Sequence, residues 1–340
     1  MINLRNDYCG VAHKKILEAI LKEANNNFVG YGLDEISKEA EELIKNKIGC
    51  QDAKVFFLIG GTITNKIMIG HMLKPYEAVI SCDSGHINVH ETGAIEQTGH
   101  KIIVCDNNNG KLTKEDVLKV VGSHSDEHMV KPKAVYISNP TEFGTIYKKE
   151  ELQELSKTCK ENGLYLYLDG ARFACALTSK YNDIDITDYK DLVDAFYIGG
   201  TKNGLISGEA LVIVNRELQK EFRYSIKHFG GMQSKGFING IMFRELFKDD
   251  LIYEIGKYQN SLAIKLEKGL EELGVNFLMK GETNQLFPIF DNNIIERLTD
   301  NIMFEYWERG EEKTVIRFVT HYLLDERDID NVLSIIKELI

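Results

Sequence analysis

The sequence predicts an α/β fold, with a mostly parallel central sheet in a large domain and a smaller C-terminal α+β domain. Three observations favour this fold. Short apolar runs alternate with helical segments from residue 55 to residue 214, which is typical of a parallel sheet covered on both faces. Two of these runs, 164–168 and 193–198, lead into polar residues, as strands do at the edge of an open sheet where ligands bind. After about residue 236, charged helices and short strands replace the alternation.

The segment before the sheet is predicted to hold two helices. Residues 1–12 are polar and irregular, and a helix with apolar residues three and four positions apart is expected to follow. The stretch FVGYGLD at 28–34 is a glycine-punctuated loop. Its last residue, Asp34, is placed to cap an amphipathic helix that runs to Ile48.

Seven apolar runs are predicted as strands of the central sheet. They are residues 55–59, 78–82, 102–105, 133–138, 164–168, 193–198 and 210–214. Helices are expected between them, one ending at Met72, one beginning with a capping box of Thr113 and Asp116, and one over 150–161.

The C-terminal part is predicted to be helical over 237–273, with a break near Asp249 and Asp250, and then to form short antiparallel strands and a final helix from Asp328. We therefore place an N-terminal arm and the large domain at 1–248 and the small domain at 249–340. With only 4 prolines in the chain, no flexible linker is expected, so the two domains are predicted to share a cleft.

The composition of the chain argues against several classes of function. A net charge of -11 argues against a nucleic-acid or anionic-membrane partner, because both require a basic surface. No signal peptide or membrane-spanning run is recognisable. The 6 cysteines form no CxxC pair and are expected to be reduced thiols. These features predict a soluble, cytoplasmic protein.

An acid, an arginine and a lysine are predicted to meet at the edge of the sheet. Asp169 ends a very apolar strand, so it needs a partner: either Arg172 in an ion pair or the cationic ring nitrogen of a ligand such as a pyridinium. Lys202 follows a glycine turn after Thr201, at the end of the next apolar run. A lysine in this position can form a Schiff base if its surroundings lower its pKa, although many surface lysines also lie in loops.

Gly60, Gly61 and Thr62 lie between a strand and a helix, where backbone N–H groups at a helix start can hold a phosphate. The turn fits neither the Walker A pattern nor GxGxxG, and a merely tight turn is the alternative.

Histidines and a further arginine complete the candidate residues. His86 and His90 with Glu91 could be a metal site, but no further ligand is spaced nearby, so no metal is predicted. The favoured interpretation of His86 is an aromatic plane for a flat ring. Arg317 lies within VIRFVT, where it either faces a cleft and grips a carboxylate or lies on an exposed edge strand.

In chain order, the motifs resemble the threonine aldolase and β-eliminating lyase family, which consists of pyridoxal-phosphate enzymes of fold type I. The matching pieces are LRNDY at 4–8, YGLD at 31–34, GGT, His86, LDGAR, the lysine after a glycine turn, and RFVTH at 317–321. The resemblance covers nearly the whole chain.

The resemblance implies a role for each candidate residue. Lys202 would carry pyridoxal phosphate as a Schiff base, Asp169 would bind its pyridine nitrogen, and His86 would stack on its ring. Gly60, Gly61 and Thr62 would hold the phosphate, with Thr201 and Arg172 beside the cofactor. Asn6, Arg172 and Arg317 would bind the carboxylate of the amino acid substrate. The implied reaction is cleavage of a β-hydroxy-α-amino acid such as L-threonine or L-allo-threonine to glycine and an aldehyde.

The sequence departs from the family pattern in ways that leave alternatives open. The loop SNPTEFGTIY contains no histidine, whereas threonine aldolases usually carry a second active-site histidine there. Another lyase or aminotransferase reaction on the same cofactor therefore remains an alternative, as does a catalytically idle homologue. The general base is left open between His86 and a water, and contacts of Lys227, His228 or Lys235 with the phosphate are left open too.

The resemblance also implies an assembly. Family members form dimers or tetramers with the active site at the subunit interface. We expect the loop at 28–34, with Tyr31, to reach the neighbouring subunit, and a plain surface loop is the alternative.

Overall fold

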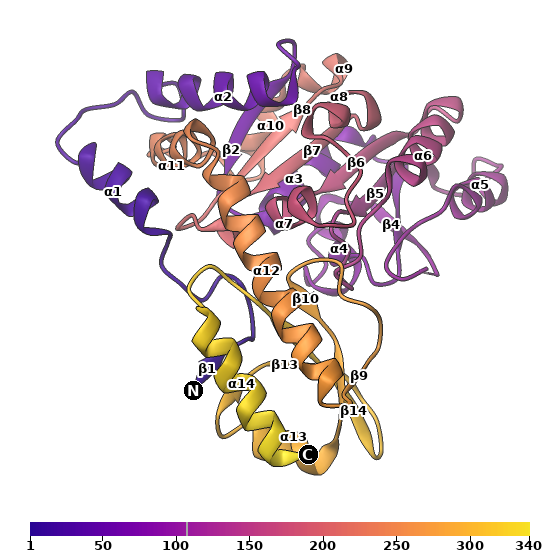
Figure 1. Cartoon of the computed structure of the whole chain (residues 1–340). Helices are drawn as coiled ribbons and strands as arrows, with labels where there is room; N and C mark the ends of the chain where they lie inside the picture. The colour runs from indigo at the N-terminus through magenta and orange to yellow at the C-terminus, as the bar shows by residue number, and fades with distance from the viewer. Residues whose placement is uncertain (107) are drawn as a thin grey trace.

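The computed structural model describes residues 1–106 and 108–340 and shows an α/β domain above a smaller α+β domain (Figure 1). The central sheet has the strand order β2-β8-β7-β6-β5-β3-β4. Every neighbouring pair in it is parallel except the two pairs made by β8, which is antiparallel to β2 and β7. The strands are β2 (Lys54–Leu58), β3 (Glu77–Cys82), β4 (Lys101–Cys105), β5 (Lys131–Ser138), β6 (Tyr165–Asp169), β7 (Ala195–Gly199) and β8 (Glu209–Ile213).

Helices cover both faces of this sheet, as the alternation of strands and helices predicts. One face is packed by α2 (Glu35–Ile48), α5 (Lys114–Ser123), α6 (Lys149–Glu161), α7 (Phe173–Thr178), α8 (Tyr189–Leu192) and α11 (Phe237–Lys248). The other face is packed by α3 (Gly61–Met72), α4 (His86–Val89), α9 (Arg216–Gln219) and α10 (Phe222–His228). Short 3-10 turns lie at η1 (Glu96–Thr98), η2 (Ile186–Asp188) and η3 (Thr201–Asn203). Helix α1 (Lys14–Lys22) packs against α11.

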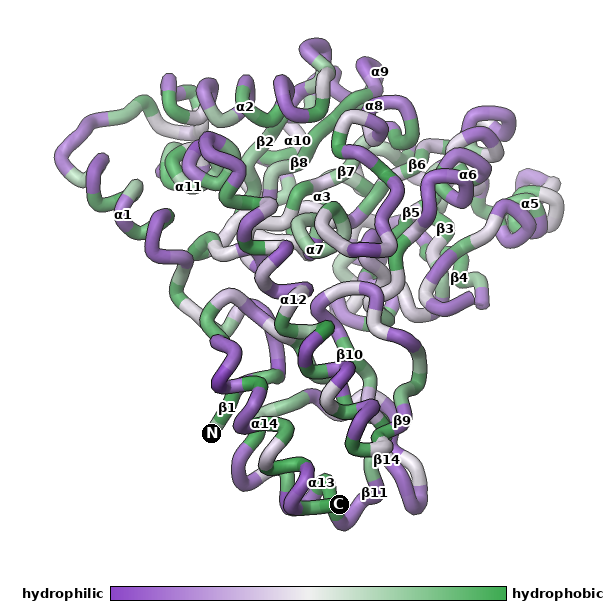
Figure 2. The backbone as a smooth tube through the Cα atoms, in the orientation of Figure 1, coloured by the Kyte–Doolittle hydropathy of each residue, from purple (hydrophilic) through white to green (hydrophobic). Residues whose placement is uncertain are grey.

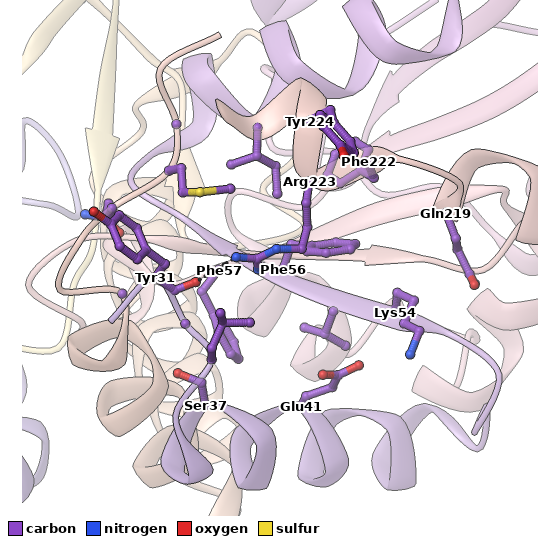
Figure 3. A pocket seen from close by; sticks show the side chains of 18 of the residues that line it. Tyr31, Ser37, Glu41, Lys54, Phe56, Phe57, Gln219, Phe222, Arg223 and Tyr224 are labelled. Atoms are coloured by element: carbon purple, nitrogen blue, oxygen red, sulfur yellow. Dashed lines mark hydrogen bonds between the residues drawn. The ribbon is translucent and has the colours of Figure 1, made fainter. Parts of the chain in front are cut away.

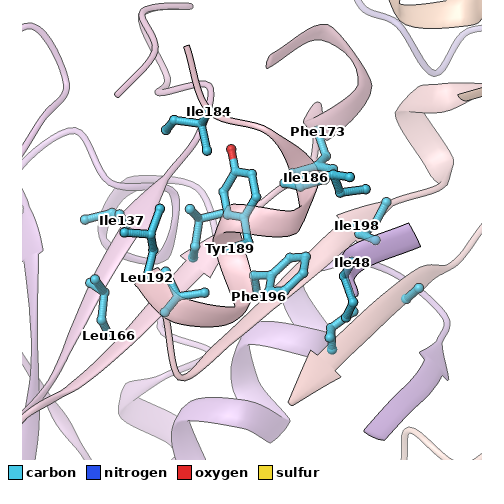
Figure 4. Packing of buried hydrophobic residues seen from close by; sticks show 14 of the residues in the cluster. Ile48, Ile137, Leu166, Phe173, Ile184, Ile186, Tyr189, Leu192, Phe196 and Ile198 are labelled. Atoms are coloured by element: carbon cyan, nitrogen blue, oxygen red, sulfur yellow. The ribbon is translucent and has the colours of Figure 1, made fainter. Parts of the chain in front are cut away.

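The residues of each strand alternate between the two faces of the sheet, because successive side chains point to opposite faces. Ile137 and Ile198 point into the cluster that α7 and α8 cover, where Phe173, Tyr189 and Phe196 pack together (Figure 4). The neighbouring tyrosines Tyr136, Tyr167 and Tyr197 belong to the opposite cluster. Figure 2 shows the apolar stretches of the chain gathered in these strands, with hydrophilic residues along the outer helix α6.

The small domain has its own core and an antiparallel sheet, with β10-β14-β11-β9 in order and β13 paired to β14. Helix α12 (Leu251–Glu272) joins the domains, since Ile252 and Ile255 pack in the large core and Leu262 and Leu266 in the small one. The remaining elements are β9 (Asn276–Phe277), β10 (Gln285–Leu286), β11 (Pro288–Asp291), α13 (Asn292–Leu298), β12 (Ile302–Met303), β13 (Glu305–Arg309), β14 (Lys313–Val319) and α14 (Glu326–Leu339).

The chain begins beside this small domain. Strand β1 (Ile2–Asn3) pairs in parallel with β12, and Leu4 belongs to the small core, so both termini lie in the same part of the molecule (Figure 1). The domain boundary at 248 stays a prediction.

Local signals in the sequence match the structure with small shifts. Asp34 accepts a hydrogen bond from the Ser37 N–H at 2.8 Å, and Thr113 forms the predicted capping box. The helical region breaks at Asp249 and Asp250 as expected. The final helix begins at Glu326, two residues before Asp328, because the Asp325 carboxylate caps it by accepting the Asp328 N–H. In the described part of the chain, no helix is long and apolar enough to cross a membrane.

Candidate active site

The carboxyl ends of the parallel strands place chemically active side chains at one edge of the sheet. Gly60 follows β2, His86 follows β3, Glu142 follows β5, Arg172 follows β6 and Lys202 follows β7. In an open α/β sheet this edge is where ligands bind. The structure therefore brings together the loops in which the sequence places the candidate residues.

Asp169 is a buried carboxylate surrounded by hydrogen-bond donors. It accepts hydrogen bonds from the Tyr136 hydroxyl at 2.7 Å, the Asn65 amide at 3.1 Å and the Ala171 N–H at 3.0 Å. Burial alone would raise the pKa of Asp169, but the charge of His86 and the surrounding donors together hold the pKa below its usual value. Asp169 therefore offers a permanent negative charge at the end of β6.

Lys202 lies on the short turn η3 directly after β7. Burial and the positive charge of Arg172 lower the pKa of the Lys202 ammonium, while the carboxylates of Asp7, Glu142 and Asp169 oppose that shift. A lowered pKa increases the fraction of neutral amine, which is the nucleophilic form.

A carboxyl group that the sequence analysis missed lies beside Lys202. Glu209 begins β8 and pairs with Leu58 on one side and Gly199 on the other. It accepts hydrogen bonds from the Gly200 N–H at 2.8 Å and the Thr201 hydroxyl at 2.9 Å. Burial raises the pKa of Glu209 to about 7. A single acid at the start of the apolar run EALVI was the signal that could have revealed it.

The turn predicted to bind phosphate lies at the N-terminus of the twelve-residue helix α3, for which Gly60 is the N-cap without a side-chain hydrogen bond. A Cβ atom at Gly60 would meet nothing within 4 Å, whereas one at Gly61 would lie 3.1 Å from the Tyr197 hydroxyl oxygen. The first N–H groups of a helix have no partner within it, so Gly61 and Thr62 can present theirs to an anion.

His86 is oriented by a buried acid. Its Nδ1 atom lies 2.8 Å from Glu91 Oε1, which also accepts a hydrogen bond from the Asn65 amide at 2.7 Å. Burial lowers the pKa of His86, but the Glu91 hydrogen bond and the charges of Glu142 and Asp169 outweigh it and raise the pKa overall. Asn65 thus connects the Asp169 and Glu91 carboxylates. Among residues 1–106 and 108–340, no group of three or more His, Cys, Asp or Glu side chains could hold a metal ion.

Arg172 pairs with Asp7, not with Asp169. Its Nε and Nη2 atoms donate hydrogen bonds to the two Asp7 oxygens, at 2.7 Å and 3.1 Å. The Asn284 amide donates a third hydrogen bond to Asp7 at 2.9 Å. The ion pair between Arg172 and Asp169 that the sequence left open is therefore not the one that forms. Asp7 was missed because only the fold brings it to Arg172.

Arg317 has a buried donor without a hydrogen-bond partner in the described part of the chain. It lies on β14, and its guanidinium carbon is 5.6 Å from the centre of the Trp307 ring. Its Nε atom is buried and has no hydrogen-bond partner among the described residues. Burial and the charge of Arg172 lower the pKa of Arg317, while Asp7 and Glu142 oppose the shift. An orphaned guanidinium donor of this kind fits a carboxylate ligand.

The other candidate residues make local contacts. The Asn6 side-chain oxygen accepts a hydrogen bond from the Tyr8 N–H at 3.2 Å. The Lys227 ammonium lies 5.8 Å from the centre of the Tyr31 ring, and His228 contacts Phe229 edge-on. No shared hydrogen bond between these residues and the Gly60 turn occurs in the described part of the chain.

A separate pocket of about 610 Å³ lies between β2, α2 and α10 (Figure 3). Phe56 and Phe57 of β2 line it, with Tyr31 at one end and Arg223 beside them. Neither Asp169 nor Lys202 lines it, so it is distinct from the cluster at the strand ends.

Known proteins resemble the chain in sequence over most of its length. The family model described as beta-eliminating lyase matches residues 3–293. A low specificity L-threonine aldolase of Pseudomonas aeruginosa is 31% identical over 284 residues, covering 82% of this chain and 82% of the relative. The low specificity L-threonine aldolase of Saccharomyces cerevisiae is 25% identical over 293 residues, covering 84% of this chain and 73% of the relative.

Solved structures show the same fold. The structure of Leishmania major threonine aldolase matches with a TM-score of 0.98 and 41% identity, covering 100% of this chain and 99% of that one. The aspartate aminotransferase of Thermus thermophilus matches with a TM-score of 0.72 at 13% identity, covering 100% of this chain and 92% of that one, which shows the fold alone.

Proposed function

The chain belongs to the beta-eliminating lyase family, and on this premise we propose that it is a pyridoxal-phosphate-dependent lyase acting on β-hydroxy-α-amino acids. The proposed substrates are of the L-threonine or L-allo-threonine type, and the products are glycine and an aldehyde. The observation that carries the proposal is that Lys202 and Arg317 share the same charged neighbours, Arg172, Asp7 and Glu142, in a chain 41% identical in sequence to a structurally matched threonine aldolase.

The residues present fit pyridoxal phosphate. Asp169 has a lowered pKa and can keep a ring nitrogen protonated, and Lys202 offers an amine with a lowered pKa for covalent attachment. The backbone of Gly60, Gly61 and Thr62 at the start of α3 suits the phosphate. When bound, this cofactor supplies an electron sink for the pair released at the substrate Cα.

His86 would lie against the face of the cofactor ring. Its Nδ1 is already engaged by Glu91, which fixes the orientation of the imidazole. Burial lowers the pKa of His86, but the Glu91 hydrogen bond and the charges of Glu142 and Asp169 raise it overall and so stabilise the cationic form. We therefore assign His86 to holding the ring and not to accepting a proton.

The substrate carboxylate is assigned to Arg317, whose Nε lacks a partner. The two donors that Arg172 gives to Asp7 are not available to a substrate, so its main task would be to fix residues 5–8 beside Lys202. Asn6 in that segment is proposed to contact the same carboxylate.

We also propose that the protein acts as a homo-oligomer with the site near the subunit interface. The loop at 28–34 exposes three apolar side chains close together, Val29 at 63%, Tyr31 at 48% and Leu33 at 51%, and grouped apolar exposure marks protein–protein contact sites. Light scattering tests this, and a monomer at working concentration would refute it.

Product analysis tests the proposed activity. The purified protein is loaded with pyridoxal phosphate and incubated with L-threonine, L-allo-threonine and L-serine. Glycine and acetaldehyde released in equal amounts from the threonines support the proposal. Release of ammonia with a 2-oxo acid, or amino transfer to an added 2-oxo acid, would assign a different reaction on the same cofactor.

A further inference from the structure

The loop after β5, which contains no histidine, carries a buried acid. Glu142 lies four residues beyond the end of β5 at Ser138, and the whole residue is only 9% exposed. A carboxyl group held this far inside the protein requires a partner or a function. A role of Glu142 in the reaction rests on the proposed function.

One oxygen of the Glu142 carboxylate accepts a hydrogen bond within the protein, and the other can accept one from a ligand. The Ser138 hydroxyl donates to Glu142 Oε1 at 3.1 Å, and Ser138 lies 3.3 Å from the hydroxyl of Tyr136, which donates to Asp169. The other oxygen, Oε2, accepts no hydrogen bond from any residue in the described part of the chain, and it is not a fully buried atom. Glu142 therefore has an acceptor facing accessible space.

The charge of Glu142 acts across the whole site. Burial lowers the pKa of five cationic groups around it, and the negative charge of Glu142 raises the pKa of each one. These groups are His86, His90, Lys202, Arg172 and Arg317. Burial raises the pKa of the Tyr136 hydroxyl most, and the charge of Glu142 raises it further. The carboxylate thus lies between the histidine side and the arginine side of the site.

The loop that holds Glu142 is rigid. Thr141 N–H donates to the Thr145 carbonyl at 2.8 Å, and the Thr145 hydroxyl donates to the Asn109 carbonyl at 2.7 Å. The Asn139 amide donates to the Tyr189 hydroxyl at 3.1 Å, and Thr283 from the small domain donates to the Gly144 carbonyl at 2.9 Å. A group held by such a network needs little reorganisation before it reacts.

His86 is a poorer candidate for the same task. Its Nδ1 is occupied by Glu91, which leaves only Nε2 to accept a proton, and Nε2 has a free lone pair only in the neutral imidazole. A carboxylate has unshared lone pairs on both oxygens and can accept a proton directly.

We propose that Glu142 is the general base that removes the proton from the β-hydroxyl group of the substrate. The hydroxyl proton moves to Glu142 Oε2, and the O–H electron pair forms the C=O bond of the aldehyde. The Cα–Cβ bond breaks and leaves its electron pair at Cα. A proton from solvent water, delivered to Cα, completes glycine, and Glu142 releases the hydroxyl proton to solvent, so the overall reaction gains and loses no proton.

The first test measures histidine pKa values and does not depend on enzymatic activity. In the protein without cofactor, a histidine NMR titration of Glu142→Gln should show lowered pKa values for both His86 and His90, because the negative charge that raises them is gone. Glu127→Gln, an exposed acid with the same change of charge, is the matched control and should leave both values in place. Unmoved values in Glu142→Gln would show that the carboxylate is not in the site.

The second test separates steps of the reaction. In the loaded enzyme, Glu142→Gln should lower kcat for L-threonine cleavage by roughly 10²- to 10⁴-fold, the usual contribution of a general base, with little change in KM. Exchange of the glycine α-proton with solvent involves no hydroxyl group, so it should persist in the same variant. Glu142→Asp, which keeps the carboxylate, should recover part of kcat and guards against a folding artefact.

The outcomes distinguish the two proposals. If the unmodified enzyme cleaves L-threonine and Glu142→Gln cleaves it equally fast, the base assignment is overturned and the proposed function stands. If the unmodified enzyme binds pyridoxal phosphate and releases no glycine from any β-hydroxy amino acid, the proposed function fails, and the role of Glu142 fails with it.

Discussion

The guanidinium of Arg172 forms two hydrogen bonds, at 2.7 Å and 3.1 Å, with the carboxylate of Asp7, a residue 165 positions earlier in the chain. Both side chains are almost completely buried, at 7% and 0% exposure. Burial would raise the pKa of Asp7, but the charges of Arg172 and Lys202 together lower it. The pair thus fixes the N-terminal arm against the loop after β6 and brings residue 7 to the edge of the site.

Breaking this pair should destabilise the protein. Asp7→Asn leaves a buried guanidinium without its counter-ion, and loss of one partner of a buried pair typically costs about 3–5 kcal/mol. Denaturant unfolding measures the change. Asp52→Asn removes one partner of an exposed pair with Arg216, with side chains 70% and 74% exposed, and should cost less than about 1 kcal/mol. Equal effects of the two substitutions would contradict a structural role for Asp7.

Arg317 should determine affinity for the substrate carboxylate. Arg317→Lys keeps the positive charge but loses the planar fork that grips both oxygens. A charge-assisted hydrogen bond contributes about 1.5–3 kcal/mol, which corresponds to a rise in KM of roughly 10- to 100-fold. Binding of pyridoxal phosphate, followed by absorbance, should not change.

Arg309→Lys is the control for that substitution, because Arg309 is an exposed arginine in the same domain, stacked 3.7 Å from the centre of the Tyr306 ring. An unchanged KM in Arg317→Lys would place the carboxylate elsewhere in the site.

Gly60 should accept a serine, and the serine should strengthen cofactor binding. The backbone at Gly60 is extended, with φ at 179°, and a Cβ atom would meet nothing within 4 Å. A hydroxyl at the helix N-terminus adds one donor to a phosphate, which should lower the Kd for pyridoxal phosphate by about tenfold. Gly61→Ser is the matched comparison, since its Cβ would lie 3.1 Å from the Tyr197 oxygen. Equal or weaker binding by Gly60→Ser would argue against phosphate at this turn.

Glu209 should make stability depend on pH. Burial raises the pKa of Glu209 to about 7, so the folded state binds the proton more tightly than the unfolded state, whose usual value is about 4.5. The free energy of unfolding should therefore fall as pH rises from about 4.5 to 7, by on the order of 3 kcal/mol, and the loss should be complete above that range.

Glu209→Gln removes this titration, so the variant without cofactor should gain stability relative to the unmodified protein as pH rises from 5 to 8. Thermal unfolding across this pH range measures the difference, with Glu18→Gln, an exposed acid, as control. A constant difference between variant and parent would contradict the shifted pKa.

The strands could be predicted from the sequence, because each apolar run carries its own signal. Asp169 stands out at the end of such a run, and Lys202 follows a glycine turn. Pairings over long distances have no local signal. Asp7 meets Arg172 only after folding, and the antiparallel strand β8 places Glu209 between Leu58 and Gly199 only because of the strand order.

Glu142 illustrates a different limit. Its loop lacks the second histidine of the family, and no motif in the sequence marks the acid that the loop contains instead. The reasoning applied to Asp169, that an acid close behind an apolar strand needs a partner, applies equally to Glu142. Glu142 lies four residues beyond the end of β5, so its position in the sequence does not indicate that it is buried. Only the folded loop brings its side chain back to Ser138 at the strand end.

The central claim is that this site holds pyridoxal phosphate on Lys202. The most direct measurement is borohydride reduction of the protein loaded with pyridoxal phosphate, followed by mass mapping of its peptides. The account predicts the reduced cofactor on the peptide that contains Lys202, with no label in Lys202→Ala treated in the same way. A label on another lysine, or none on a protein that remains folded, would contradict it.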